Sequence, residues 1–201
     1  MQFTTLTLAA ISIVSAIAAP SAVARSDPKI LTSAISEVSD TRSAVDNQVA
    51  IIKNLVQTTV NSAVVPALQA SLQNIAGEIT SVTSFVKPLV TDVALPLAQA
   101  ELDNLPGFVA DVQAIAGDVQ DAANVILAGL SQQTLGLVKS EVLLVLATVN
   151  PFVQPVIQFA NSAIVGASGP STDSVQTAVA TTQVIVGQIV GPITAAYTKI
   201  N

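Results

Sequence analysis

Apolar residues recur at alternating steps of three and four positions along most of this 201-residue chain. That spacing puts one residue per turn on a single helix face, and over several heptads it is typical of helices that pack side by side. A β-strand would need strict alternation of apolar and polar residues, and no long stretch has it. The most regular run is Val65, Leu68, Leu72, Ile75, Ile79, Val82, Val86, Leu89 and Val93.

Two further runs have the same period, one near each end of the chain. Val, Ile and Thr are abundant and favour strands, but a period sustained over several heptads outweighs that preference. We therefore predict an all-α fold, an antiparallel bundle of about five to seven helices with some kinked at proline. The first run is Leu31, Ile35, Val38, Val45, Val49, Ile52 and Val56, and the last is Val175, Val179, Thr182, Val186, Ile189, Ile193, Ala196 and Ile200.

Capping residues and prolines predict several helix ends in the first two thirds of the chain. Pro28 follows two N-cap candidates, Ser26 and Asp27, so the first helix is expected to begin there. Pro106-Gly107 is expected to end one helix and to open another that runs to about Leu130. Three further prolines interrupt helical patterns and should kink or divide them: Pro88, Pro96 and Pro192.

The last third contains its own start and stop signals. Ser131 is expected to cap a helix that stops before Asn150-Pro151, and a shorter helix should follow from Phe152 to Val165. Ala167-Ser168-Gly169-Pro170 is the best linker in the chain. Ser171 or Thr172 is then expected to cap the last helix.

The N-terminus has the features of a secretory signal peptide. Leu6 to Ala19 is an apolar run of suitable length, and Ala16-Ile17-Ala18 supplies a small-residue cleavage site. We predict a signal peptide over residues 1–18 and a single all-α domain over 26–201; a membrane anchor is the alternative, disfavoured because the run is short for a span. The chain contains no cysteine, so helix packing or a partner, not disulfides, must hold the secreted domain together.

From Val142 to Thr198 the chain carries a single charged side chain, Asp173. Such a segment must be buried against itself or against something else. A membrane hairpin between Val142 and Gly169 is disfavoured, because each amide and hydroxyl side chain in it would seek a partner in hydrocarbon. Gly187-x-x-x-Gly191 is expected to allow close packing of the last helix on a neighbour.

The absence of histidine and cysteine removes the commonest catalytic and metal-binding side chains. Ser-His-Asp and Cys-His catalysis and zinc sites built from these residues are excluded. Two carboxylates would suffice for a glycosidase, but Glu101 and Asp103 are two apart and would not share a helix face. Asp111, Asp118 and Asp121 are expected to form a solvated polar face. We predict that the protein is not an enzyme and has neither cofactor nor metal.

The net charge of −6 and the scattered basic residues exclude another class of partner. Nucleic-acid binding needs clustered Lys and Arg, and no cluster exists. Arg42 interrupts the first apolar run at a position where the period calls for an apolar residue. It is expected to reach out to solvent or pair with Asp46 one turn on; binding of a ligand carboxylate is the alternative.

The chain resembles the fungal hydrophobic surface-binding proteins and the related cell-wall galactomannoproteins. The resemblance rests on about Asp27 to Val149, chiefly Ile35-x-x-Val38…Val45-x-x-x-Val49-x-x-Ile52 and the segment Phe85-Val-Lys-Pro-Leu-Val90. It implies a helical, secreted or wall-associated protein that adsorbs to hydrophobic solids or binds fatty acids between helices. The uncharged extension after Val149 departs from that pattern and is more similar to cysteine-free secreted proteins that coat mushroom hyphae.

We therefore predict a secreted, non-enzymatic protein, extracellular or wall-associated, that adsorbs to hydrophobic surfaces or the cell wall through apolar helix faces. The alternative is a soluble helical carrier that holds a fatty acid or other lipid between its helices. The expected partners are hydrophobic surfaces, wall components or lipid and not nucleic acid, with self-association left open. The residues predicted to contact a surface or lipid are Phe85, Phe108, Phe152, Val156, Phe159 and Tyr197.

Overall fold

The computed structural model describes residues 29–58 and 62–200, and these ranges contain helices but no strand, which confirms the all-α prediction. The long helices are α1 (Lys29–Thr58), α2 (Val65–Val86), α4 (Gln99–Gly129), α5 (Gln132–Ala163) and α6 (Pro170–Gln188). The short elements are η1 (Ser62–Val64), α3 (Leu89–Asp92), η2 (Ile189–Ile193) and α7 (Thr194–Thr198). The signal peptide predicted for residues 1–18 and the cap candidates Ser26 and Asp27 lie outside the described residues.

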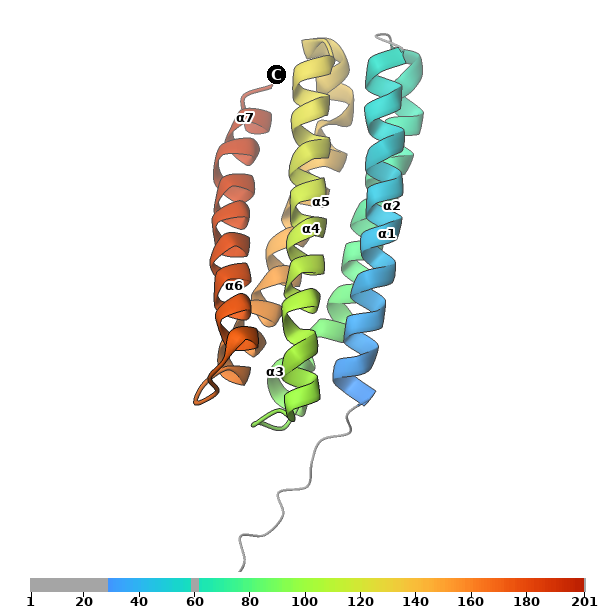
Figure 1. The fold of residues 1–201 in the computed structure, drawn as a ribbon. Coiled ribbons are helices and arrows are strands. Elements are labelled where there is room, and N and C mark those ends of the chain that lie inside the picture. Colours follow the sequence, from blue (N-terminus) through green and yellow to red (C-terminus); the bar gives the residue numbers. More distant parts are fainter. Residues whose placement is uncertain (1–28, 59–61, 201) are drawn as a thin grey trace, which may run out of the picture.

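Four of the long helices form a ring, and consecutive long helices run antiparallel, as predicted (Figure 1). The order around the ring is α1, α2, α5 and α4, so that α1 lies parallel to α4 and α2 lies parallel to α5. The chain crosses from α2 to α4 at the end of the ring where α3 lies, and Leu89 and Leu97 are buried there. α6 lies outside the ring against α4, with a smaller contact on α5.

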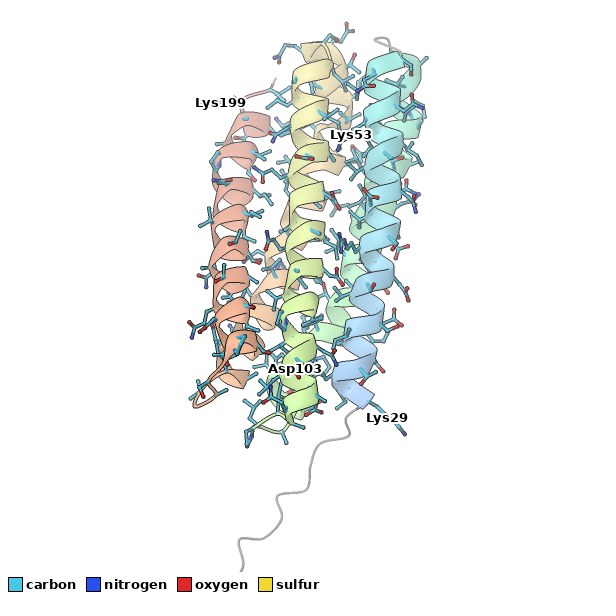
Figure 2. The ribbon with its side chains drawn as sticks, viewed as in Figure 1. Lys29, Lys53, Asp103 and Lys199 are labelled. Atoms are coloured by element: carbon cyan, nitrogen blue, oxygen red, sulfur yellow. The ribbon has the colours of Figure 1, made fainter. Side chains whose placement is uncertain are left out.

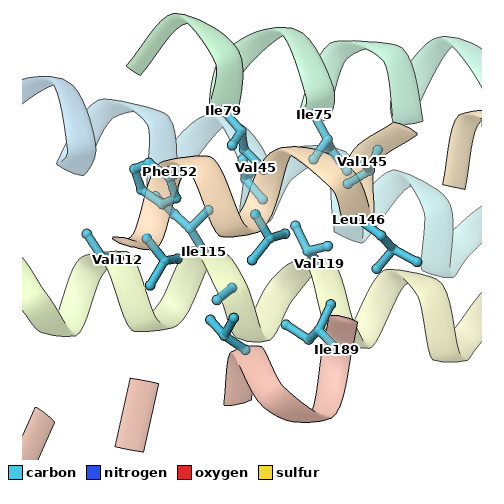
Figure 3. Close-up of a cluster of buried hydrophobic side chains, with 14 of the residues drawn as sticks. Val45, Ile75, Ile79, Val112, Ile115, Val119, Val145, Leu146, Phe152 and Ile189 are labelled. Atoms are coloured by element: carbon cyan, nitrogen blue, oxygen red, sulfur yellow. The ribbon is translucent and has the colours of Figure 1, made fainter. Parts of the chain in front are cut away.

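The predicted apolar faces form the core inside the ring (Figure 3). The whole α2 run from Val65 to Leu89 is buried, and only its last member, Val93, is half-buried. The residues that Figure 3 labels come from every helix of the ring and from η2: Val45, Ile75, Ile79, Val112, Ile115, Val119, Val145, Leu146, Phe152 and Ile189.

The α1 face is shifted by one residue at two positions from the predicted one. Ala34 and Thr41 are buried, whereas Ile35 is half-buried and Arg42 is exposed. Arg42 therefore does not interrupt the apolar face, because Thr41 takes that place with its methyl group available for packing. The period of the run predicted the helix correctly. The side of the helix that is buried differs at these two positions, because the small residues Ala34 and Thr41 are buried there and neither is strongly hydrophobic.

α4 has a second buried face, which explains where α6 packs. Val109, Ala116 and Ala123 are seven residues apart and have 0%, 0% and 2% of their surface exposed. A seven-residue spacing keeps them in line along one side of the helix. α6 and η2 cover this side with the predicted C-terminal run. Its buried members within α6 and η2 are Val175, Val179, Thr182, Val186, Ile189 and Ile193, and its last member, Ile200, is also buried.

Three prolines lie inside long helices, and two of them, Pro106 and Pro151, were wrongly predicted to end a helix. Pro106 is within α4, and Pro151 and Pro155 are within α5, which is continuous from Gln132 to Ala163. All three occupy exposed or half-exposed positions, while Phe152, Val153 and Val156 beside the α5 prolines are buried. Packing of these side chains holds the helix together where a backbone hydrogen bond is missing. The remaining interruptions agree with the prediction: Pro88 separates α2 from α3, Pro96 lies in the α3–α4 connection, and Pro192 lies in the π-helical η2.

The helix ends agree with the predicted caps in one case and differ in another. The Ser131 hydroxyl accepts the Thr134 N–H at 3.3 Å and caps α5, as predicted. The linker before α6 is also correct, but the N-cap is Gly169, which has φ of +123°. Ser171 was predicted as a cap; its hydroxyl instead donates to the Asp103 carboxylate of α4 at 2.8 Å.

Glycine allows a close helix approach at a position other than the predicted one. Gly187 and Gly191 are exposed, and a Cβ on either would meet nothing within 4 Å, so the expected close packing is wrong for the described chain. At Gly129, a Cβ would lie 2.1 Å from a Val56 methyl carbon. The ends of α1 and α4 therefore come together across Gly129.

Candidate functional site

Five of the six residues predicted to contact a surface or lipid lie in the core. Phe108, Phe152, Val156, Phe159 and Tyr197 have at most 1% of their surface exposed, because each lies on a helix face that another helix covers. Phe85 is 38% exposed at the end of α2. In the closed bundle the five cannot touch an external surface, so contact through them requires opening; their role stays a prediction.

The interior of the ring is filled. A void between α2, α4 and α5, next to Leu72, Val119 and Val142, encloses about 170 Å³ between atoms and has no room for a water-sized sphere. A fatty acid cannot enter this space without separation of the helices. Among the residues that the structure describes, the two apolar pockets with room for a ligand are open grooves on the surface.

An open groove of about 370 Å³ runs between the parallel helices α2 and α5. We call it the α2–α5 groove, and its volume is at the lower end of the range for small-molecule sites. Leu144, which is 52% exposed, forms its most apolar part. The lining residues are Thr80, Thr83 and Ser84 of α2, Lys87 directly after α2, and Leu144, Ala147, Thr148 and Pro151 of α5.

The hydroxyl groups in this groove are already engaged. Thr80 and Thr83 donate to the carbonyls of Ala76 and Ile79 at 2.7 and 2.6 Å. Ser84 and Thr148 each donate at 2.7 Å to a carbonyl three residues earlier on the same helix. A threonine hydroxyl bonded to its own helix leaves its methyl group for other contacts. The walls of the α2–α5 groove are thus more apolar than their composition indicates.

Two features give the groove polarity at defined points. Lys87, exposed at the end of α2, contributes the one charged side chain among the described residues that line it. Pro151 has no N–H, so the carbonyl of Ala147 lacks the donor that an α-helix would normally supply. The groove therefore combines an apolar wall with one cation, and Ala147, one of its lining residues, has a carbonyl without the usual helical donor.

A second groove, of about 390 Å³, lies on the other side of α2. We call it the α1–α2 groove. Phe85 lines it, and so does Ser84, which lines the α2–α5 groove as well. Its lining residues are Lys29, Ile30 and Ser33 of α1, Ser84 and Phe85 of α2, and Pro88 and Asp92 at α3. Figure 2 shows Lys29 at the same end of the bundle as α3, opposite Lys199.

The polar residues between α1 and α4 form ion pairs. Arg42 reaches out to solvent, which was one of the two expectations, and its partner is Asp111 at 2.5 Å, not Asp46. Lys53 lies 3.5 Å from Asp121. Of the three carboxylates expected on a solvated face of α4, Asp111 and Asp121 thus pair with α1, and the Asp121 side chain is still 63% exposed. The pKa of Asp118 is raised by burial and by the nearby Asp46 carboxylate.

The other carboxylate pair considered for catalysis has structural roles. Glu101 accepts the backbone N–H of Ala98 at 2.7 Å and so caps α4. Asp103 accepts hydrogen bonds from Gln99 and Ser171, both at 2.8 Å. Within 29–58 and 62–200 no group of three or more Asp and Glu side chains is placed to hold a metal ion.

Two helical stretches are long and apolar enough to cross a membrane by length and composition, Gln132–Ala163 and Pro170–Thr198. The core helix of a soluble protein meets the same criteria, and half of the most apolar window of the first stretch is buried in the bundle. Its side chains such as Phe152 and Phe159 already have helices around them. In the second stretch 29% of the most apolar window is buried, so burial against the chain itself accounts for the lack of charge in α5 and for a smaller part of it in α6 to α7.

No protein-family model and no curated protein sequence matches this chain. A distant structural match is the crystal structure of AfMp4p in complex with palmitic acid, which is 12% identical in sequence. The match covers 83% of this chain and 99% of AfMp4p, with a TM-score of 0.35. A likeness at that TM-score does not support an inference about function, so the proposed function depends on the geometry of this chain.

Sequence reasoning found Phe85 but missed both grooves. The signals were present: hydroxyl residues on one face of α2 at Thr80 and Ser84, followed by Lys87, and Pro151 one turn after Ala147 on α5. They gain meaning only when α2 and α5 are known to be parallel neighbours. These helices are separated in sequence by α3 and α4, so no local pattern pairs them.

Proposed function

We propose that this chain is a non-enzymatic helical protein that binds amphiphilic lipid, with an acyl chain lying in the α2–α5 groove. The single observation that carries the proposal is the chemistry of that groove: its hydroxyls are engaged, Leu144 is half exposed, and Lys87 is the charge. An acyl chain would cover the apolar wall, and an anionic head group would pair with Lys87. Secretion and a location at the cell wall belong to the same proposal, from the N-terminal sequence.

The size of the groove sets the expected affinity. Each methylene moved fully out of water contributes about 0.8 kcal/mol. Roughly ten buried methylenes would give about 8 kcal/mol, before subtraction of the loss of translational and rotational freedom on association. The groove is open, so each methylene is only partly buried. Micromolar or weaker binding is therefore expected, since 1 μM corresponds to about −8 kcal/mol.

The test is displacement of a fluorescent fatty acid in three variants. Leu144→Gln places an amide in the apolar wall, and Lys87→Gln removes the charge; both should weaken binding, the second chiefly for ionised head groups. Val184→Gln is the matched control, because Val184 is 59% exposed on α6, away from the groove. Equal affinity in wild type, Leu144→Gln and Val184→Gln would exclude this groove as the lipid site.

Adsorption to hydrophobic surfaces is a second candidate, favoured by the way the C-terminal helices are attached. α6 and η2 pack on α4 through a buried apolar face, and two hydrogen bonds hold the end of this C-terminal segment. Tyr197 donates to the carbonyl of Ala123 at 2.7 Å, and Lys139 donates to the carbonyl of Ile200 at 2.7 Å. Release of this segment would expose its own apolar face and the second face of α4 together. The apolar surface would then be large enough to bind a solid or self-associate.

The second candidate is tested with Tyr197→Ala, which loosens the attachment of α7 without shortening the chain. If the segment opens during adsorption, this variant should coat a hydrophobic sensor surface faster than wild type. The measurement is mass uptake on a methyl-terminated surface at several concentrations. Unchanged uptake by a variant whose C-terminal amides exchange faster would exclude release of α6–α7 as the adsorption step.

A further inference from the structure

The two grooves on either side of α2 meet at a single small residue. Ser84 lines both the α2–α5 groove and the α1–α2 groove, which hold about 370 and 390 Å³. Its hydroxyl donates to the carbonyl of Ser81 at 2.7 Å, so the side chain lies against its own helix. A serine in this position makes a low ridge that a ligand can cross, whereas a large side chain there would separate the grooves.

Both grooves have an apolar wall near this ridge. Leu144 and Pro151 supply it on the α5 side. Phe85, Ile30 and Pro88 supply it on the α1 side, with Phe85 38% exposed. Each groove alone is at the lower end of the size range for small-molecule sites. Each therefore suits one acyl chain, and together they suit a ligand with two.

The charges around the ridge favour an anionic group. Lys87 follows Ser84 by one turn and lines the α2–α5 groove, and Lys29 lines the α1–α2 groove. The α1–α2 groove also contains Asp92, whose carboxylate accepts the Thr91 hydroxyl at 2.7 Å. Lys29 and Asp92 line the α1–α2 groove together, so the net positive charge next to the ridge comes from Lys87.

We infer that the ligand is a two-chain anionic glycerolipid that straddles the end of α2. One acyl chain lies in the α2–α5 groove and the other in the α1–α2 groove; the glycerol crosses the ridge at Ser84, and the phosphate pairs with Lys87. This inference rests on the proposed function, because it assigns the class of lipid to that site. It adds the second groove and the number of chains.

The experiment compares a short-chain phosphatidic acid with its one-chain lyso form, both below their micelle concentrations, by calorimetry on the full chain. Leu144→Gln should weaken both lipids about tenfold, since about 1.4 kcal/mol of apolar contact corresponds to that factor. Phe85→Gln should weaken the two-chain lipid by a similar factor and leave the lyso form unchanged. Ser84→Trp, which raises the ridge, should also affect the two-chain lipid alone. Val184→Gln is the control for a change of an exposed apolar residue elsewhere, and helix content is checked for every variant.

Two results would overturn this inference. The first leaves the proposed function standing, and the second rejects the proposed function as well. If Leu144→Gln weakens both lipids while Phe85→Gln and Ser84→Trp weaken neither, the α2–α5 groove binds one chain and only the two-chain assignment fails. If wild type binds neither lipid nor the fluorescent fatty acid, the proposed function itself fails. A preference of wild type for the two-chain lipid that is lost in Phe85→Gln supports the inference.

Discussion

Tyr197 offers a sharp test of how the C-terminal segment is held. Its ring is fully buried, and its hydroxyl donates to the carbonyl of Ala123 at 2.7 Å. Tyr197→Phe removes the hydroxyl and keeps the ring. The Ala123 carbonyl lies well inside α4 and keeps its helical donor, Leu127, four residues on. The variant should therefore lose one net hydrogen bond, about 1 kcal/mol, and leave no buried group unsatisfied.

Tyr197→Ala provides the scale for that value. Loss of the whole buried ring should cost roughly 3–5 kcal/mol, because a cavity is added to the lost apolar contact. For a chain of this size, 1 kcal/mol shifts Tm by about 2–4 °C. Thermal unfolding followed by far-UV circular dichroism should rank wild type, Tyr197→Phe and Tyr197→Ala in that order, with the first gap several times smaller than the second.

The location of the effect is as informative as its size. Hydrogen exchange should accelerate first in α7 and η2 for both variants, because Tyr197 attaches that end of the chain to α4. Lys139→Met, which removes the contact with Ile200, should act on the same amides with a smaller change in Tm. If Tyr197→Phe melted as low as Tyr197→Ala, the hydroxyl would have a role beyond one hydrogen bond, and the reasoning would be wrong.

Three further predictions follow from single contacts. Burial raises the pKa of Tyr197 well above its ordinary value of 10.0, so the stability that the buried neutral phenol contributes is complete below pH 10 and is lost as the pH rises further. Tyr197 is the sole tyrosine, so the absorbance at 295 nm reports its ionisation, and this absorbance should rise only together with the loss of helix. Burial and Asp46 raise the pKa of Asp118, so its charged form opposes folding at neutral pH. Asp118→Asn should therefore raise Tm at pH 7 and leave Tm unchanged at pH 3. An equal shift of Tm at both pH values would contradict this. Gly129→Ala should lower stability by about 1–3 kcal/mol in urea unfolding, because its Cβ would meet a Val56 methyl carbon at 2.1 Å, whereas Gly187→Ala, with open space, should not destabilise.

Period and capping chemistry were enough to predict the class of fold. The α2 run is buried along its whole helix, and Ser131 caps α5 as its position before a helical run suggested. These features depend on residues within one or two turns of each other, so the sequence displays them directly. The phase of α1 could not be predicted in the same way, because Ala34 and Thr41 are buried by the shape of neighbouring helices and not by their own hydrophobicity.

The prolines of α5 show where local sequence signals fail to predict the end of a helix. Asn150-Pro151 predicts a break, yet the helix continues through Pro151 and Pro155 because Phe152, Val153 and Val156 beside them are buried in the core. That packing energy comes from distant parts of the chain and is larger than the loss of a helical hydrogen bond. The candidate site was missed for the same reason: its walls come from α2 and α5, which only the folded ring brings together.

The lack of charge in the α5 part of the segment from Val142 to Thr198 is explained by core packing and does not identify that part as a binding surface. α5 is buried on two sides, by the ring and by α6, so its lack of charge follows from its place in the bundle. Removal of everything after Glu141 would cut α5 in its first half and take away Leu144, Thr148 and Pro151, one wall of the α2–α5 groove. Loss of binding in such a truncation would therefore not identify the segment as a binding surface. The grooves that flank α2 combine open apolar walls with Lys87, so substitutions at Leu144, Ser84 and Phe85 address function while leaving the core intact.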